Sequence, residues 1–139
     1  MKLDGFTIQD THTRLLKREF SCEELTRHYL DAVSEKNKSL NAFLEVFDDA
    51  VEQARVADKR IAEGEAGELT GIPLAIKDNI LIQGYRATAG SKALANYTAS
   101  FDATAIAKLK RAGAIFLGRT NMDEFAMGSS TENSSFGPT

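Results

Sequence analysis

Lys77 is the residue whose type and position most clearly suggest chemistry. It follows the apolar run IPLAI (residues 72–76) and precedes the turn-forming pair Asp78-Asn79. An apolar run of this length predicts a strand that is buried on both faces within a helix-covered sheet. Ligands and catalytic groups gather at the carboxyl ends of such strands in open α/β sheets. Lys77 is therefore the first candidate catalytic residue.

A lysine can act as a base only in an unusual environment, because its ordinary pKa is about 10.4. Burial or a neighbouring cation must lower that pKa by roughly three units, and a dry strand end would supply the burial. Asp78 would oppose the shift by stabilising the ammonium, but consecutive strand residues point to opposite faces and are not expected to touch. The alternative is a lysine that extends into solvent or pairs with a structural carboxylate.

The tail of the chain, residues 128–139, is rich in serine and glycine and is the second candidate. Serine hydroxyls can act as nucleophiles, and backbone amides in a glycine-containing loop can bind an oxyanion. Ordinary surface loops have the same composition, so composition alone does not decide between the two interpretations. We expect the tail to have no structure of its own.

Cys22, His12 and His28 are the other side chains that often carry chemistry. Cys22 falls in the first turn of a predicted helix with no base set beside it, so we interpret it as a helix-face residue rather than a nucleophile. The two histidines have no partner at ligand spacing and are expected on the surface. The sequence therefore predicts no metal site.

Helical and extended patterns alternate as in an α/β fold. Helices are predicted over residues 7–18, from Ser21 to about residue 37, from a cap at Asp48 to about residue 63, from Asp102 to residue 112, and over residues 122–126. Strands are predicted at residues 41–47, up to Lys77 and at residues 114–117, with residues 80–82 continuing the extended path. No repeat or composition break marks a second domain.

The overall composition is that of a soluble globular protein. The 17 basic and 20 acidic side chains nearly balance, so no strong field favours direct binding of nucleic acid. The first residues lack the apolar core of a signal peptide, and no apolar run approaches the ~18 residues of a spanning helix. We therefore expect a cytoplasmic protein without a membrane partner.

Several motifs together resemble the N-terminal part of the amidase signature family. They are GIPLAIKDN from Gly71, TAGSKAL from Thr88, and DATAIAKLKRAGAIFLGRTNMDEFAMGSSTENSSFGPT from Asp102. The resemblance implies that residues 1–139 are a partial amidase domain, with N-terminal helices in 1–67 and the start of an α/β core in 68–139. It implies a mixed sheet covered by helices and incomplete here, with an unpaired edge on the strand at Lys77 or the strand at Ile115.

The family uses a triad of Ser, cis-Ser and Lys, and the resemblance places its lysine at Lys77. This lysine acts through a bridging serine on a second serine, which attacks an amide carbonyl. Both serines are expected outside this sequence, in a signature that follows it. Ser129 and Ser130 lack the Gly-Gly pairs that flank that signature, so neither is taken as the nucleophile. Met127, Gly128 and Ser129 are expected to line the acyl pocket.

Within the family, the ending NMDEFAMGSSTENSSFGPT most resembles the A-type subunits, which work in glutamyl-tRNA(Gln) amidotransferases. For that group the resemblance implies glutamine as the amide donor and the B and C subunits as partners. Ammonia would travel to the B subunit, which uses ATP and Mg²⁺ and makes most of the tRNA contacts. No cofactor is expected in this chain, and aspartyl-tRNA(Asn) is an equally open acceptor.

Two other functions remain open from the sequence. The first is another amidase of the same family, which acts on small amides without a tRNA partner. The second is a truncated, non-catalytic fragment that serves as an assembly partner. In either of the enzymatic interpretations, the 139-residue chain alone is expected to be inactive, because it contains the base but no matched nucleophile.

Overall fold

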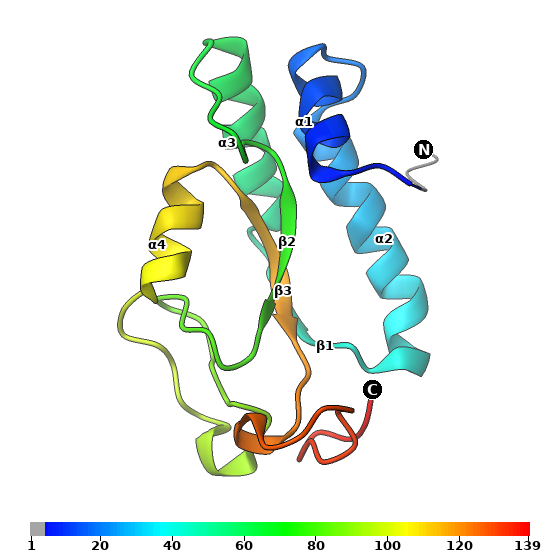
Figure 1. Cartoon of the computed structure of the whole chain (residues 1–139), viewed down its shortest axis with the longest axis vertical. Helices are drawn as coiled ribbons and strands as arrows, with labels where there is room; N and C mark the ends of the chain where they lie inside the picture. Colours follow the sequence, from blue (N-terminus) through cyan, green and yellow to red (C-terminus); the bar gives the residue numbers. More distant parts are fainter. Residues whose placement is uncertain (1–4) are drawn as a thin grey trace.

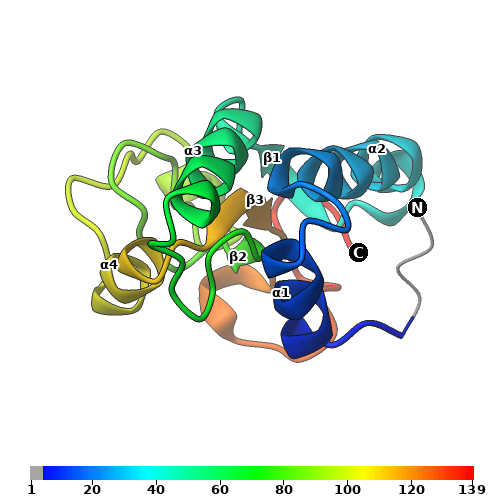
Figure 2. The same ribbon diagram turned by 90° about the horizontal axis from the view of Figure 1, so that it is seen from above.

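The structure is a computed structural model and describes residues 5–139 (Figure 1). Its elements, in chain order, are α1 (Ile8–Leu16), α2 (Cys22–Leu40), β1 (Phe43–Val46), α3 (Ala50–Ala62), β2 (Pro73–Lys77), the 3-10 turn η1 (Lys92–Leu94), α4 (Thr104–Arg111), β3 (Ile115–Thr120) and the 3-10 turn η2 (Glu124–Ala126). Figure 2 shows the sheet in the middle of the molecule with the helices around it. The predicted α/β class is confirmed.

The sheet has three strands in the order β1-β3-β2. The central strand, β3, pairs antiparallel with β1 and parallel with β2. Its residues from Ile115 to Arg119 are all buried, with Ile115 in one apolar cluster and Phe116 in the other. A strand whose side chains pack into a different apolar cluster on each face must be apolar on both faces. This explains the continuous apolar run AIFL that precedes Gly118.

Strand β2 differs from the prediction that it is buried on both faces. Among the described residues it pairs only with β3, and both Ala75 and Lys77 are exposed. Only Ile76 within the strand is buried, packing against Phe116 on one face of the sheet. The expected unpaired edge therefore lies on β2, whereas the strand at Ile115 is central.

The helix starts are set by side-chain caps in two cases and not in two others. Ser21 accepts from the N–H of Glu24, whose carboxylate accepts from Ser21 in return, as the capping box predicts. The predicted cap at Asp48 and the predicted helix start at Asp102 are wrong. Helix α3 begins after Asp49 without a side-chain cap, and Asp102 instead accepts from the N–H of Gln83 and binds Lys110.

The chain turns directly after β2, as the pair Asp78-Asn79 predicts, and residues 80–82 beyond the turn form no strand. The N–H of Ile80 donates to the carbonyl oxygen of Lys77 at 2.9 Å, which closes the turn. Ile82 is nevertheless buried against Ile76 and Ile106, and this packing explains its apolar character. None of the helices within residues 5–139 is both long enough and apolar enough to cross a membrane.

Gly118 provides a test of this strand arrangement. A Cβ added at this position would lie 2.2 Å from the carbonyl oxygen of Glu45, so β1 could not keep its place beside β3. Gly118→Ala is expected to lower the free energy of unfolding by about 3 kcal/mol, the upper range for overpacking, because backbone atoms must move. Gly67→Ala is the control, since the atom nearest to its added Cβ, the carbonyl oxygen of Ala112, lies at 3.4 Å, an ordinary contact distance. Urea unfolding that gave equal losses for both variants would argue against the β1–β3 pairing.

Candidate functional site

The carboxyl ends of β2 and β3 bring the two sequence candidates to one edge of the sheet. The strands are parallel, and Lys77 lies in register with Thr120. The chain leaves β3 directly into residues 121–139, which fold across this end of the molecule (Figure 1). Lys77 and the serine-rich tail therefore belong to the same end of the fold, as strand topology requires.

Lys77 is exposed in this structure. Within residues 5–139 its side chain makes no hydrogen bond or ion pair. The dry environment expected at the strand end is therefore absent, because β2 is an edge strand. The predicted separation from Asp78 is confirmed: no hydrogen bond or ion pair joins the two side chains, and Asp78 is 1% exposed whereas Lys77 is exposed. Asp78 therefore belongs to a different set of contacts from its neighbour.

Asp78 is the centre of a buried hydrogen-bond network. Its carboxylate accepts from the N–H of Thr88 at 3.1 Å and from the N–H of Gly90 at 2.9 Å, and it also accepts from the Thr88 hydroxyl. From the neighbouring strand β3, Nη1 of Arg119 donates to the carboxylate of Asp78 at 2.6 Å. Hydrogen bonds from several donors satisfy a carboxylate that would otherwise be very costly to bury.

Arg119 links this carboxylate to the opposite edge of the sheet. Its guanidinium is buried and donates through Nε to Glu45 on β1 at 2.7 Å. One planar side chain thus holds carboxylates on both sides of β3, which a lysine could not do with the same geometry. Removing one partner of a buried pair typically costs about 3–5 kcal/mol, because a charge is left without compensation.

The tail is ordered, so the expectation that it has no structure of its own is wrong. It contains no helix or strand after η2, but the carboxylate of Asp123 accepts from the N–H groups of Ser130, Thr131 and Asn133 at 2.9–3.1 Å. The N–H of Asn133 makes the largest contribution to lowering the pKa of Asp123 below its ordinary value of 3.8. A single carboxylate therefore organises the loop.

Two asparagines fix the end of the tail to the sheet. Nδ2 of Asn41 lies 3.1 Å from three carbonyl oxygens of residues 136–138. Nδ2 of Asn121 donates to Asn41 and to Gly137, and its Oδ1 accepts from the hydroxyl of Ser134 at 2.6 Å. These bonds hold a segment of low apolar content that could not be held by packing alone.

Met127, Gly128 and Ser129 form an exposed part of this loop. Met127 is 79% exposed, and Ser129 makes no hydrogen bond within the described residues. A Cβ at Gly128 would lie 2.4 Å from the carboxylate of Asp123, so the loop can wrap this closely only with glycine there. The hydroxyl of Ser130 donates to Glu132 at 2.7 Å, so it is not paired with Lys77.

The other candidate side chains lie away from this edge. Cys22 is fully buried, and burial together with Asp58 raises the pKa of its thiol far above the ordinary value, which disfavours the thiolate. His28 is half-buried. His12 is also half-buried rather than on the surface, and its Nε2 is enclosed without a partner among the residues that the structure describes. Within residues 5–139, no cluster of His, Cys, Asp and Glu is suited to hold a metal.

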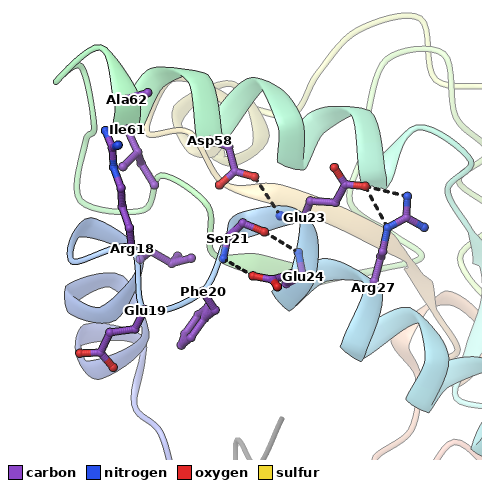
Figure 3. Close-up of a pocket in the computed structure, with 11 residues that line it drawn as sticks. Arg18, Glu19, Phe20, Ser21, Glu23, Glu24, Arg27, Asp58, Ile61 and Ala62 are labelled. Carbon is purple, nitrogen blue, oxygen red and sulfur yellow. Dashed lines mark hydrogen bonds and ion pairs between the residues drawn. The ribbon is translucent and has the colours of Figure 1, made fainter.

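A pocket of about 700 Å³ opens at the opposite end of the molecule, where the N-terminal end of α2 meets the last turns of α1 and α3 (Figure 3). Asp58 already accepts from the N–H groups of Cys22 and Glu23 at 2.7 and 3.1 Å. The carboxylate of Glu23 is in turn bound by Arg27. The carboxylates of this pocket therefore have partners within the fold, and Lys77 remains the better candidate.

Sequence reasoning missed Asp78, Arg119 and Asp123 as structural centres. A usable signal existed for Arg119, since an arginine directly after the apolar run AIFLG must meet a carboxylate when it is buried. Asp78 and Asp123 gave no comparable signal. Their partners are backbone N–H groups, which every sequence segment provides.

The family assignment follows from comparison with known proteins. A sequence model of the Amidase family matches residues 24–139, and the chain belongs to the amidase family. Among curated relatives, the A subunit of the glutamyl-tRNA(Gln) amidotransferase of Ralstonia pickettii is 54% identical over 132 residues, which are 94% of this chain and 26% of the relative. The chain thus spans about a quarter of the length of that relative.

Solved structures agree with this assignment. The peptide amidase of Stenotrophomonas maltophilia matches with a TM-score of 0.89 at 31% identity, over 98% of this chain and 29% of its own. The A subunit of the glutamyl-tRNA(Gln) amidotransferase of Thermotoga maritima matches with a TM-score of 0.75 at 36% identity, over 100% of this chain and 28% of its own.

The role of Asp123 can be tested through pH. Because the folded-state pKa is below 3.8, the charged carboxylate supports the loop at higher pH, and this support is lost only as the pH falls below 3.8. Asp123→Asn is expected to lower the protection of the amides of residues 130, 131 and 133 against exchange near neutral pH, and to abolish the loss of protection that the wild type shows as the pH falls below 3.8. Exchange measured by NMR should be unchanged in the control Glu132→Gln. Unaltered protection in Asp123→Asn would show that other contacts hold the loop.

Proposed function

We propose that this chain provides the catalytic base and part of the substrate-binding edge of the A subunit of a glutamine-hydrolysing amidotransferase. The product ammonia would serve the conversion of Glu-tRNA(Gln) to Gln-tRNA(Gln). The observation that carries the proposal is the position of Lys77 at the carboxyl end of β2, beside the end of β3 from which the ordered loop departs. Glutamine is the amide donor in this proposal.

The relatives favour an amidotransferase over other amidases. Identity to the Ralstonia pickettii A subunit is 54%, against 31% to the peptide amidase. The TM-score is higher for the peptide amidase, but the segments compared cover less than a third of either solved chain, where the fold is common to the family. Sequence identity therefore distinguishes the two functions better than backbone similarity does.

The proposed reaction is an acyl transfer. Neutral Lys77 accepts a proton from a bridging cis-serine, which takes the proton of a second serine as that serine attacks the side-chain amide carbon of glutamine. The C–N bond then breaks, the nitrogen leaves as ammonia with the proton returned to it, and an acyl-enzyme remains. Water releases glutamate from this ester. Both serines lie outside residues 1–139 in this proposal, and Met127, Gly128 and Ser129 line the acyl pocket.

The proposed base needs a change of environment. Lys77 is exposed here, and neutral lysine at neutral pH requires desolvation or a nearby cation. The unpaired edge of β2 indicates where covering residues would act, since a further strand or loop packed there would bury the lysine. In this proposal, the dry surroundings of Lys77 come from residues packed on that edge.

The partners in this proposal are the B and C subunits of the amidotransferase. The B subunit would use ATP and Mg²⁺ to activate the glutamyl group and would make most of the contacts with tRNA, so this chain needs no cofactor of its own. Use of Asp-tRNA(Asn) is equally compatible with this site. A cytoplasmic location is part of the proposal.

Replacement of the lysine tests the proposed base. In a complete A subunit that contains residues 1–139, in complex with the B and C subunits, Lys77→Met is expected to reduce glutamine-dependent turnover by at least ~10³-fold, because the serines lose their activating base. Folding should persist, since methionine nearly matches the aliphatic stem of lysine. Activity with added ammonium should also persist, because free ammonia bypasses glutamine hydrolysis.

Lys92→Met is the matched control. Lys92 is exposed in η1 at the same end of the molecule, and its loss should leave glutaminase turnover unchanged. Near-normal glutaminase turnover in Lys77→Met would exclude Lys77 as the base. Equal losses in both variants would point to a general effect of charge.

The 139-residue chain alone is expected to hydrolyse neither glutamine nor simple amides above a buffer control. It contains the proposed base but no matched nucleophile, so no covalent route to an acyl-enzyme exists. Mass spectrometry after exposure to an activated ester tests this directly. A stoichiometric adduct on Ser129 or Ser130 that disappears in Lys77→Ala would instead show that the tail supplies the nucleophile.

A further inference from the structure

Asp78 is bound at its backbone as well as at its side chain. Its N–H donates to the carbonyl oxygen of Thr120 at 3.1 Å, and its carbonyl oxygen accepts from the N–H of Ala89 at 3.1 Å. The neighbouring turn is closed by the bond from Ile80 to Lys77. The residue that follows the proposed base therefore has its backbone and its carboxylate fixed, and the Cα–Cβ direction of Lys77 is fixed with it.

The segment that binds Asp78 also binds the tail. Residues 88–90 donate three hydrogen bonds to the carboxylate of Asp78. Two of their carbonyl oxygens accept from the loop that carries Met127: Ala89 from the N–H of Phe125 at 2.8 Å, and Gly90 from the N–H of Ser135 at 2.9 Å. Residues 88–90 thus form a bracket with Asp78 on one side and the tail on the other.

The bracket has little freedom to shift. Gly90 has a φ of +66°, and a Cβ there would lie 2.5 Å from the carbonyl oxygen of Met122, so the two backbones are in close contact. On its other side Asp78 is held by Arg119, which Glu45 holds in turn. A displacement of Asp78 would therefore be transmitted to the tail, and the reverse is also true.

We propose that Asp78 is a positioning residue that sets both the direction of Lys77 and its register with the loop of residues 125–135. It does so through the bracket of residues 88–90, without contact between its side chain and the amine of Lys77. This inference rests on the proposed function, because it concerns how the base is placed. The inference predicts that the carboxylate of Asp78 matters for turnover although it does not contact the amine of Lys77.

Asp78→Asn is the first test, made in the complete A subunit in complex with the B and C subunits. The variant keeps the shape of the side chain but replaces one acceptor oxygen by a donor and removes the charge that Arg119 needs. Glutaminase kcat is expected to fall roughly 100-fold, the effect of a displacement of about 1 Å, while KM for glutamine changes less than about threefold. Ammonium-dependent activity should remain.

A double-mutant cycle separates positioning from general stability. If Asp78 acts through Lys77, then Asp78→Asn should cause no further loss of glutaminase activity in a Lys77→Met background. A role in stability alone would lower ammonium-dependent activity as well and would add to the Lys77 effect. Either of these results would overturn the inference.

Thr88→Val is a second variant that should fold, because it removes only one hydroxyl and keeps the N–H bond to Asp78. Its kcat should fall by a smaller factor than that of Asp78→Asn. Asp78→Glu, which keeps the charge, should have a higher kcat than Asp78→Asn.

The matched control is Asp58→Asn, in which another carboxylate that accepts two backbone N–H groups is changed at the opposite end of the molecule. It should lower the melting temperature without changing kcat.

The outcomes distinguish this inference from the proposed function. An active Lys77→Met enzyme would refute the proposed function whatever Asp78 does. An inactive Lys77→Met enzyme together with an Asp78→Asn or Thr88→Val enzyme that keeps kcat within about twofold would refute only the positioning role.

Discussion

The buried ion pair between Asp78 and Arg119 is the interaction on which the arrangement of this site depends. Both side chains are almost fully buried, so each requires the other, and the two carry bonds to β1 and to residues 88–90. The desolvation cost of such a pair is offset only when its remaining donors and acceptors are also bound. This requirement explains why three chain segments far apart in sequence converge beneath the end of β2.

The same end of the fold combines rigid support with open surface. Backbone and carboxylate bonds hold the turn after β2 and the loop after β3, whereas Lys77 and Met127 remain exposed. A site that acts in acyl transfer needs its groups held in place before substrate binds. The proposed base would take dry surroundings from other residues packed on the exposed edge of β2, and the Ralstonia pickettii relative is about four times the length of this chain.

The sequence predicted the elements better than their environments. Helical spacing and the capping box at Ser21 located α2, and the glycine at residue 113 separated α4 from β3. The apolar run before Lys77 led to the wrong expectation that β2 is buried on both faces. An apolar run indicates that a strand is kept from water, but it does not indicate which part of the chain covers that strand. The order of the tail could not be predicted, since backbone bonds to Asp123 leave no periodic pattern. The boundary at residue 67 and the acyl-pocket roles stay predictions.

Chemical rescue gives the most direct test of Lys77 as the base. In the complete, assembled A subunit, Lys77→Ala should release almost no ammonia from glutamine, and small primary amines added to the buffer should restore release at rates that rise with amine basicity. Alcohols of the same size should have no effect. Release of ammonia by Lys77→Ala at the wild-type rate without any amine would contradict the account.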